Sequence, residues 1–321
     1  MRTTTLGSDG PEVGVIGLGC MGMSFSYDVA TPRDEDTLIA VIHQALDQGM
    51  TLLDTADVYG PFTNEELLGK ALKTCRERAV LATKVGALDR DADGNPVRGN
   101  NGRPEHIQRS IDESLKRLGT DHVDVYYLHR VDPDVPIEES VGALAETVQA
   151  GKARAIGLSE VNVDQIKRAQ SVHPVTAVQS ELSLWTRDWM TEVLPYCAQE
   201  GIAFVPYSPL GRGFLTGRFT SYNDLPQDDS RRGLARFQQE ALRQNLGIVD
   251  QVKQIATRLG ATPAQVALAW VLAQGEYVIP IPGTKTPTYL LDNAGAADIE
   301  LSPGDLAALD ALPVPQGGRY L

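Results

Sequence analysis

Short apolar runs alternate with longer amphipathic segments along almost the whole chain. The runs are rich in Val, Ile, Leu and aromatic residues, and eight of them stand out, at residues 13–18, 51–55, 79–84, 123–129, 153–159, 176–180, 202–208 and 278–283. Strands of a parallel sheet that are buried on both faces have this continuous apolar character. The pattern therefore predicts eight buried strands.

The segments between the first runs have the spacing of helices. Apolar residues recur three and four positions apart, which predicts amphipathic helices at residues 35–49, 64–75, 103–119 and 137–151. Eight strand and helix repeats are typical of a closed (β/α)8 TIM barrel, an α/β fold. We expect residues 1–321 to form this barrel as a single domain. An irregular stretch at about 209–236 follows the seventh run and predicts a functional flap.

Three glycines near the first run have the spacing of a dinucleotide-binding turn. Gly17, Gly19 and Gly22 form G-x-G-x-x-G, but the next helical pattern begins only near Asp34. The first strand-end acid, Asp54, lies well beyond the roughly 20 residues that separate turn and acid in a Rossmann fold. We therefore expect these glycines to let the chain turn tightly at the mouth of the first strand, rather than to grip a pyrophosphate.

The charge balance argues against nucleic acid and membrane partners. The chain has 29 Lys and Arg against 42 Asp and Glu, a formal net charge of −13. Binding to phosphate polymers or to anionic membrane surfaces normally depends on clusters of basic side chains. We expect neither as a partner.

Cysteine usage and the absence of long apolar stretches bear on the compartment. Cys20, Cys75 and Cys197 show no C-x-x-C spacing, and one of them is left unpaired in any disulfide scheme. That usage suits a reducing environment. The start of the chain lacks a long apolar core, and no stretch approaches the roughly 20 apolar residues of a membrane span. These features predict a cytoplasmic protein.

Four polar side chains lie at or just after the carboxyl ends of consecutive strands. They are Asp54, Tyr59, Lys84 and His129. Such strand ends converge on one mouth of a barrel, where catalytic groups collect. A phenol can protonate a carbonyl oxygen there, and we expect the Lys84 ammonium to lower its pKa from about 10. Asp54 would hold Lys84, and His129 would orient the carbonyl.

Each of these residues taken singly also fits a structural ion pair or a hydrogen-bonded core position. Their joint placement favours catalysis, specifically the reduction of a carbonyl group. The other histidines lack metal-ligand spacing, so no metal site is predicted; they are His43, His106, His122 and His173.

Several longer motifs resemble those of the aldo-keto reductases, in order and over essentially the whole chain. They are "GVIGLGCMGMS", "LLDTADVYG", "LATKVG", "DVYYLH", "GLSEVN", "VPYSPLGRGFLTG" and "IPGTKTPTYLLDN". The likeness is strongest to a microbial and plant branch of that superfamily. The resemblance implies a (β/α)8 barrel and NADPH-dependent reduction of aldehydes or ketones. It also implies an Asp, Tyr, Lys and His tetrad, which falls on the four residues found at the strand ends.

The resemblance further implies how the nicotinamide of NADPH is held. Its ring would stack on Tyr207, and its carboxamide would lie against Ser159, Glu160 and Gln179. The family often has Asn at the position of Glu160. A carboxylate accepts hydrogen bonds but cannot donate to the carboxamide oxygen, which puts that contact in question.

The remaining cofactor contacts are also implied by resemblance. Glycine-rich amides after the seventh run would cradle the pyrophosphate, and Lys285 would lie beside the 2′-phosphate, which favours NADPH over NADH. Some members have Arg where this chain has Tyr289. Asp292 and Asn293 would contact adenine. Together with these, the expected cofactor residues are Gly19, Cys20, Met21, Ser208, Leu210, Gly211, Gly213, Gly217, Gly283 and Thr284.

Apolar residues near the mouth predict a pocket for a small aldehyde or ketone. The candidates are Met23, Phe25, Tyr27, Val58, Trp185, Phe214 and Phe219. Two alternatives to a reductase stay open. One is a redox-sensing or regulatory barrel with negligible turnover, as in potassium-channel β subunits. The other is a lyase or aldolase that uses Lys84 as a Schiff base. Monomer and homo-oligomer also both stay open.

Overall fold

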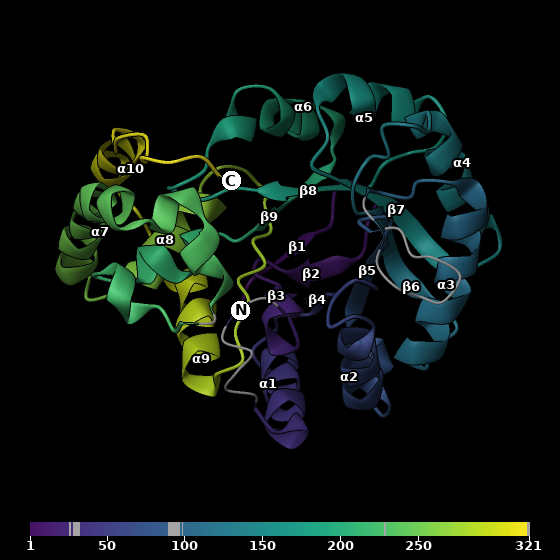
Figure 1. Cartoon of the computed structure of the whole chain (residues 1–321), viewed down its shortest axis with the longest axis horizontal. Helices are drawn as coiled ribbons and strands as arrows, with labels where there is room; N and C mark the ends of the chain where they lie inside the picture. The colour runs from purple at the N-terminus through teal and green to yellow at the C-terminus, as the bar shows by residue number, and fades with distance from the viewer. Residues whose placement is uncertain (26, 28–32, 89–96, 98, 228, 320–321) are drawn as a thin grey trace.

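The barrel is built from parallel strands that follow one another in sequence order. A computed structural model describes residues 1–25, 27, 33–88, 97, 99–227 and 229–319. Neighbouring strands pair in parallel from first to last (Figure 1). They are β3 (Leu18–Gly19), β4 (Leu52–Asp54), β5 (Val80–Val85), β6 (Val123–Leu128), β7 (Ala153–Ser159), β8 (Ala177–Glu181) and β9 (Ala203–Tyr207). Seven of the eight predicted runs thus contribute a barrel strand.

The eighth run closes the barrel without forming a continuous strand. Ile279 and Ile281 each donate a backbone hydrogen bond to β9 at 3.0 Å, and Gly17 donates to Pro280 on the other side, also at 3.0 Å. Pro280 and Pro282 have no N–H, so they cannot complete a ladder. The run therefore bridges the first and seventh barrel strands, and the predicted (β/α)8 architecture is confirmed.

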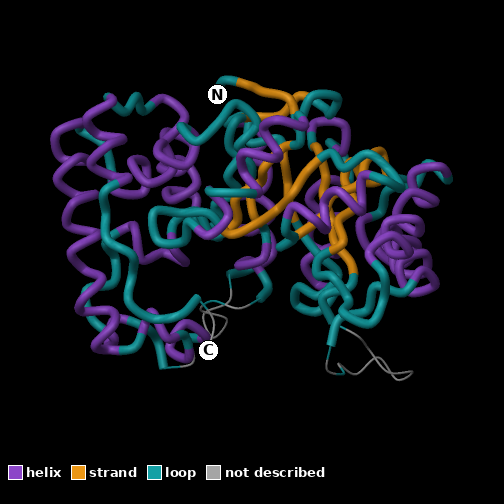
Figure 2. Tube along the Cα trace, turned by 90° about the horizontal axis from the view of Figure 1, so that it is seen from above, coloured by secondary structure: helices purple, strands orange, loops and turns teal. Residues whose placement is uncertain are grey.

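A hairpin that the sequence analysis did not separate from the first run covers one end of the barrel. It consists of β1 (Thr3–Thr5) and β2 (Glu12–Gly14), which pair antiparallel. The run at 13–18 is therefore not one strand. Leu6 and Val13 are buried and pack into the barrel interior. Figure 2 shows the hairpin at one end of the strands.

Ten α-helices within the described residues surround the strands (Figure 1). The four predicted helices are confirmed with small shifts at their ends. The helices are α1 (Glu35–Asp47), α2 (Thr63–Leu72), α3 (Pro104–Leu118), α4 (Ile137–Gln149), α5 (Val163–Gln170), α6 (Val193–Glu200), α7 (Gln239–Leu259), α8 (Pro263–Leu272), α9 (Pro287–Gly295) and α10 (Pro303–Asp310).

Local sequence explains where several of these helices begin. Asn162 and Gln165 form a reciprocal capping box at the start of α5, and Thr262 and Gln265 do the same for α8. Such caps satisfy amide groups that have no partner within the helix. Helix α3 begins with Pro104, whose fixed φ suits the first helical position.

The stretch at 209–236 contains only short 3-10 turns among its described residues. They span Gly211–Thr216, Tyr222–Asp224 and Ser230–Gly233, and a fourth begins at Ala235. Arg231 holds the stretch together, because its guanidinium bonds to Asp229 at 2.6 Å and to the Arg212 carbonyl at 2.9 Å. The predicted flap is thus an ordered loop that leads into α7.

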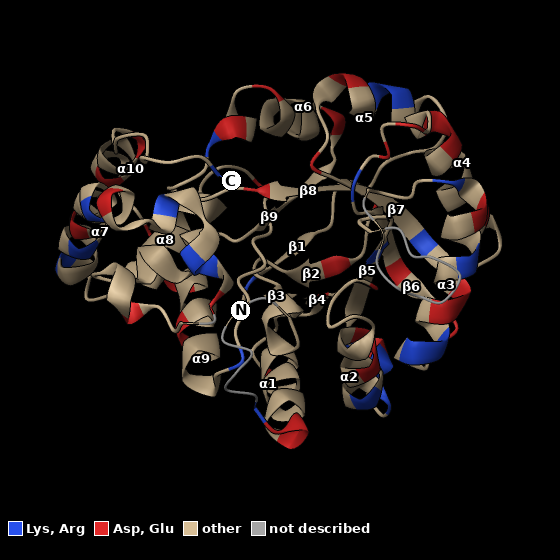
Figure 3. Cartoon of the chain, viewed as in Figure 1, with Lys and Arg blue, Asp and Glu red and all other residues tan. Residues whose placement is uncertain are grey.

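The barrel interior is apolar, and charged residues lie mainly on the helices and loops around the strands (Figure 3). The interior is filled by Leu52, Val80, Ala82, Val125, Tyr127, Ala177, Ala203, Val205, Ile279 and Ile281. Side chains of this size pack a barrel solid, so chemistry is confined to its mouth. Within the described part of the chain, no helix has the length and apolar character needed to cross a membrane.

Two of the three clustered glycines are explained by close packing at the barrel seam. A Cβ on Gly17 would lie 2.7 Å from the Leu52 carbonyl oxygen, and one on Gly19 would lie 2.7 Å from the Ile281 carbonyl oxygen. A Cβ on Gly22 would meet nothing within 4 Å. None of the three has a positive φ. The chain does turn tightly at the mouth of the first strand, in the 3-10 turn Met21–Met23 that contains Gly22. Gly17 and Gly19 instead allow the close approach of neighbouring strands.

This packing predicts that Gly17→Ala destabilises the barrel by about 1–3 kcal/mol, because the new methyl group forces apart backbone that cannot move cheaply. Gly22→Ala, in the same motif, should change stability by no more than about 0.5 kcal/mol. Urea denaturation followed by circular dichroism measures both. Equal effects of the two substitutions would contradict the seam explanation.

Candidate active site

The four strand-end residues come together at the barrel mouth. Asp54 ends β4, Lys84 lies near the end of β5, Tyr59 is in the loop after β4, and His129 follows β6. All four are almost inaccessible, with exposed fractions of 3%, 8%, 0% and 8% for Asp54, Tyr59, Lys84 and His129. Adjacent parallel strands bring these side chains to one edge, as the sequence predicts.

Lys84 is the centre of the hydrogen-bond network. Its Nζ donates to Asp54 Oδ1 at 2.5 Å and to the Thr55 carbonyl at 2.8 Å, and it lies 3.4 Å from the Tyr59 hydroxyl. The second Asp54 oxygen accepts from Gln179 Nε2 at 2.7 Å. Each carboxylate oxygen therefore has a donor, and the ammonium is fixed beside the phenol.

The pKa values of the network differ in part from the expectation. Burial would lower the pKa of the Lys84 amine, but Asp54 and Tyr59 outweigh it and the net direction is upward. Burial raises the pKa of Tyr59 above 10.0, and Lys84 opposes that shift without reversing it. The predicted net lowering is therefore wrong. A raised pKa keeps the phenol protonated at neutral pH, which is the state that a general acid needs.

His129 is held as a neutral imidazole. Burial lowers its pKa well below 6.5, and the charges of Lys84 and Arg130 lower it further. Its ring meets the Tyr59 ring edge to face, with centroids 5.8 Å apart. The Nδ1 atom is buried and has no protein partner. A neutral ring donates one hydrogen bond and accepts another, so it can orient a carbonyl without competing as an acid.

Arg130 is a site residue that the sequence analysis missed. Its Nη1 donates to the His129 carbonyl at 2.6 Å and to Ser159 Oγ at 3.0 Å. The guanidinium thus connects the histidine with a residue expected at the carboxamide. The sequence feature that could have identified Arg130 is its position directly after His129.

The residues expected around the nicotinamide lie at the ends of the next three strands. Ser159 ends β7, Gln179 is in β8, and Tyr207 ends β9. Glu160 follows Ser159 with a φ of 56°, a left-handed conformation that is unusual for a residue with a Cβ. Its backbone donates to the Gln179 carbonyl at 3.0 Å. The structure brings all four to the same side of the mouth.

Arg319 from the C-terminal tail reaches this group and was not predicted. Its Nη2 lies 2.7 Å from Glu160 Oε1 and donates to the Tyr207 hydroxyl at 2.6 Å. Its Nε donates to Glu181 Oε2 at 2.8 Å. Arg212 adds a second cation beside Glu181, at 3.3 Å. No spacing in the sequence indicates this contact, because it joins β7, β8 and β9 to the end of the chain.

The expected pyrophosphate cradle has a suitable backbone shape, but several of its amides already have partners. Positive φ values occur at Ser208, Gly211, Arg212, Gly213 and Gly217. Backbone in this conformation can form a concave anion site. The amides of Gly211, Gly213 and Gly217, however, donate within the loop. Leu210 immediately precedes the first 3-10 turn of the loop.

Lys285 and the flap meet at Tyr27. Lys285 Nζ donates to the Tyr27 carbonyl at 3.3 Å, and the Arg231 guanidinium lies 5.0 Å from the Tyr27 ring centroid. The Tyr27 hydroxyl also bonds to Ser208. Tyr27 therefore lies between the two expected phosphate-binding segments rather than in the apolar pocket wall where we expected it.

The other expected cofactor residues divide into accessible and buried positions. Gly19 pairs with Gly283 at the barrel seam, and Thr284 is half-buried just before α9. Cys20 is buried with its thiol near the Leu18 carbonyl. Met21, half-buried, begins a 3-10 turn.

Of the two residues expected at adenine, one already has a protein partner and the other is buried. Asp292 accepts from the Thr262 hydroxyl at 2.9 Å, and Asn293 is 3% exposed. Tyr289, in contrast, is exposed on the first turn of α9.

Only part of the expected pocket wall faces the catalytic residues. Phe25 is 41% exposed and stacks on Tyr59 with centroids 6.2 Å apart, whereas Met23 is buried. Trp185 and Phe214 stack on each other at 4.2 Å inside the core. Phe219 is also buried there, against Phe237. Val58 is half-buried in the loop that carries Tyr59.

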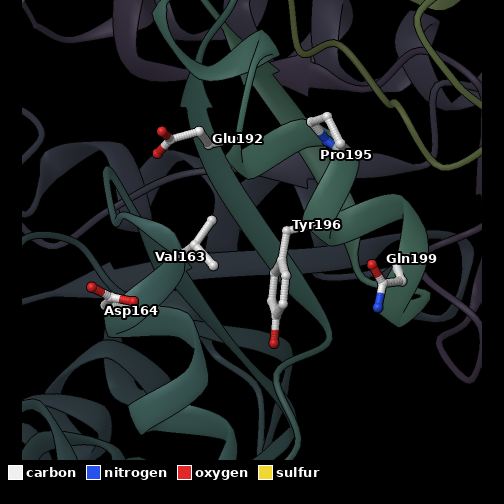
Figure 4. Close-up of a pocket in the computed structure, with 6 residues that line it drawn as sticks. All are labelled: Val163, Asp164, Glu192, Pro195, Tyr196 and Gln199. Atoms are coloured by element: carbon white, nitrogen blue, oxygen red, sulfur yellow. The ribbon is translucent and has the colours of Figure 1, made fainter.

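A hollow between α5 and α6 lies apart from this chemistry. It is lined by Val163, Asp164, Glu192, Pro195, Tyr196 and Gln199 (Figure 4). None of these residues belongs to the tetrad or its partners. Across the residues that the structure describes, no group of three or more His, Cys, Asp and Glu side chains could hold a metal ion.

The match to a family model decides what kind of protein this is. Residues 15–313 match the model described as "Aldo/keto reductase family". The chain belongs to the aldo/keto reductase family. It is therefore an oxidoreductase that acts on carbonyl compounds or the corresponding alcohols, as its motifs predict.

Related aldo/keto reductases cover the whole chain. A protein named "Probable aldo-keto reductase 1" from Glycine max is 47% identical over 100% of this chain and 92% of its own length. A glycerol dehydrogenase from Gluconobacter oxydans has a similar structure, with a TM-score of 0.86 and 30% identity over 96% of this chain and 94% of that one. A Klebsiella pneumoniae aldo/keto reductase in complex with NADP and acetate has a TM-score of 0.74 and 28% identity, covering 100% and 99%.

The environment of His129 predicts how the stability of this reductase depends on pH. The folded pKa lies well below 6.5, so as pH falls below 6.5 the unfolded chain gains a proton on this residue and the folded chain does not. Stability is thus lost with falling pH, by up to about 1.4 kcal/mol per pH unit. His129→Gln should remove this component. Urea denaturation at several pH values from neutral to mildly acid measures it, and identical slopes for both proteins would contradict a neutral His129.

Proposed function

We propose that this protein reduces aldehydes or ketones to alcohols with NADPH, and that Tyr59 is the general acid. The observation that carries the proposal is the buried contact between the Lys84 ammonium, Asp54 and the Tyr59 hydroxyl. The choice of cofactor is supported by the family membership of the chain. Two similar structures of aldo-keto reductase from Klebsiella pneumoniae, one in complex with NADP and acetate and one with NADPH, support it further.

The tetrad acts on the carbonyl oxygen. The bound cofactor supplies a hydride to the carbonyl carbon. Tyr59 gives its phenolic proton to the oxygen as negative charge develops there, and Lys84 stabilises the phenolate that results. Asp54 keeps Lys84 charged and in position. His129, neutral at working pH, donates a hydrogen bond that orients the carbonyl.

Several features of the chain fit an NADP molecule. The Tyr207 ring offers a stacking surface, and Lys285 offers a cation for the 2′-phosphate. Helix α9 begins two residues after Lys285, at Pro287, and helix N-termini favour anionic groups. The buried Nδ1 of His129 without a protein partner is the kind of atom that a bound molecule satisfies.

The two alternative functions are weaker. A Schiff base requires a neutral amine, whereas the pKa of Lys84 is raised and its Nζ is already bonded to Asp54 and Thr55. A regulatory barrel with negligible turnover would have no need of a complete tetrad, and all four members lie together. A panel of aldehydes and ketones, assayed by loss of NADPH absorbance, separates a reductase from a cofactor-binding sensor.

The central prediction is that Tyr59→Phe loses carbonyl reduction by about 100-fold or more, because the hydroxyl that donates the proton is gone. Binding of NADPH, measured by fluorescence titration, should be unchanged. Tyr196→Phe, in the hollow of Figure 4, is the matched control and should keep full activity. Full turnover by Tyr59→Phe would refute the assignment of the acid.

Lys285→Ala tests the cofactor preference. Loss of a charge-assisted hydrogen bond to the 2′-phosphate should weaken NADPH binding about tenfold or more and leave NADH binding nearly unchanged. Isothermal titration calorimetry with both cofactors measures this. Lys167→Ala on α5 serves as a charge control. Equal losses of affinity for NADPH and NADH would show that Lys285 does not bind the 2′-phosphate.

A further inference from the structure

The ion network at the ends of β7, β8 and β9 contains one residue from far along the chain. Arg319 contacts Glu160, Glu181 and the Tyr207 hydroxyl, all within 2.8 Å. We propose that Arg319 is a nicotinamide-binding residue, and that Glu160 and Arg319 together bind the carboxamide of the cofactor. The inference rests on the proposed function, because it assumes that NADP binds at this mouth.

The need for a second residue follows from hydrogen-bond chemistry. A carboxamide donates through its NH2 group and accepts through its oxygen, which has two lone pairs. Asn can match both halves, but the carboxylate of Glu160 offers only acceptors. Ser159 can donate one hydrogen bond to the oxygen through its hydroxyl. A guanidinium has only donors, so Arg319 can supply the donor that the Glu160 carboxylate lacks.

The Glu160 carboxylate is fixed in a way that suits this pairing. Its Oε1 accepts from the Glu181 backbone at 2.9 Å and pairs with Arg319. A carboxylate has about four acceptor positions, so lone pairs remain for an NH2 group. The left-handed backbone at Glu160 turns the residue out of β7, and such strain persists only where the surroundings enforce it.

The charges of the network also explain why a cation is required. Glu160 and Glu181 lie close together, so their carboxylates repel each other unless cations intervene. Arg319 contacts both, and Arg212 contacts Glu181. Removing Arg319 would leave the Glu160 carboxylate beside the proposed nicotinamide position without its neutralising partner.

The tail that carries Arg319 is anchored just before it. The Gln316 backbone donates to Asn245 Oδ1 at 2.8 Å, and Asn245 Nδ2 donates back to the Gln316 carbonyl at 3.1 Å. Arg236 donates to the Gly317 carbonyl at 3.2 Å. Both polar groups of the Asn245 side chain, on α7, thus form hydrogen bonds with the tail. Because the tail is held in advance, Arg319 contributes to binding without a large ordering cost.

Equilibrium binding of two cofactors tests the proposal on the full-length chain. The probes are NADP+ and its 3-acetylpyridine analogue, which keeps the carbonyl oxygen but carries a methyl group in place of NH2. Arg319→Ala should weaken the binding of both about tenfold or more, because each retains the acceptor that Arg319 contacts. Glu160→Ala removes the acceptor for NH2, so its effect should be several-fold larger for NADP+ than for the analogue.

Two further variants control for misfolding of Arg319→Ala and for the loss of a positive charge elsewhere on the surface. Arg319→Gln keeps one neutral NH2 donor group and should show an intermediate loss, and it replaces Arg319→Ala if that variant fails to fold. Arg243→Ala, an exposed cation on α7 paired with Glu240, should leave both affinities unchanged. Circular dichroism and thermal melting confirm the fold of each variant.

Each outcome has a defined meaning. Unchanged affinity for both probes in Arg319→Ala overturns the proposal, and tighter binding overturns it by showing that the tail covers the site. A Glu160→Ala effect of the same size for both probes overturns the pairing with NH2. If the wild-type chain binds no NADP+ at all, the proposed function fails instead, so the two failures are distinguishable.

Discussion

The buried ion pair between Lys84 and Asp54 is the interaction on which the mouth of the barrel depends. Removing two charges from water is costly, and such a pair is tolerated only when further hydrogen bonds satisfy its remaining atoms. The Thr55 carbonyl accepts a second hydrogen bond from Lys84, and Gln179 donates a hydrogen bond to the second carboxylate oxygen of Asp54. Closure of the barrel makes this possible, since Gln179 comes from β8, far along the chain from the strands that carry the pair. Lys84, Asp54 and Gln179, which come from three different strands, are therefore parts of one network.

The apolar runs were sufficient to predict the barrel because buried parallel strands leave a strong pattern. Seven runs became strands, and the eighth closes the seam even though Pro280 and Pro282 interrupt its ladder. The hairpin at the N-terminus could not be recognised in the same way. Residues 13 and 14 continue an apolar run but pair with Thr3 and Thr4 instead. Periodicity indicates burial, but it does not say which partner covers a residue.

The clustering of the tetrad could be predicted because Asp54, Lys84 and His129 lie at or next to strand ends, and Tyr59 follows one of these ends in the adjoining loop. The pKa of Tyr59 could not, since the balance between burial and the Lys84 charge depends on how closely the loop packs. Arg319, Glu181 and Arg231 were missed for a different reason. Their contacts join distant segments, and a single charged residue in a tail or a loop has no pattern that distinguishes it from a solvated surface residue.

Backbone strain among the described residues is concentrated where β7 and β9 end at the mouth. Of the four residues other than Gly with a positive φ, three are Glu160, Ser208 and Arg212, at the ends of β7 and β9 and in the loop that follows. Such conformations cost of order 1–3 kcal/mol each. A fold tolerates that cost where side chains must be aimed at a ligand that the barrel does not itself provide. Asp54, Tyr59, Lys84 and His129 themselves have ordinary backbone, but Gly60 and Phe62, in the loop that carries Tyr59, also have positive φ. The two parts of the mouth are thus built by different means. Strand register brings Asp54, Lys84 and His129 together, whereas loops with positive φ and long-range ion pairs place Glu160 and Arg212.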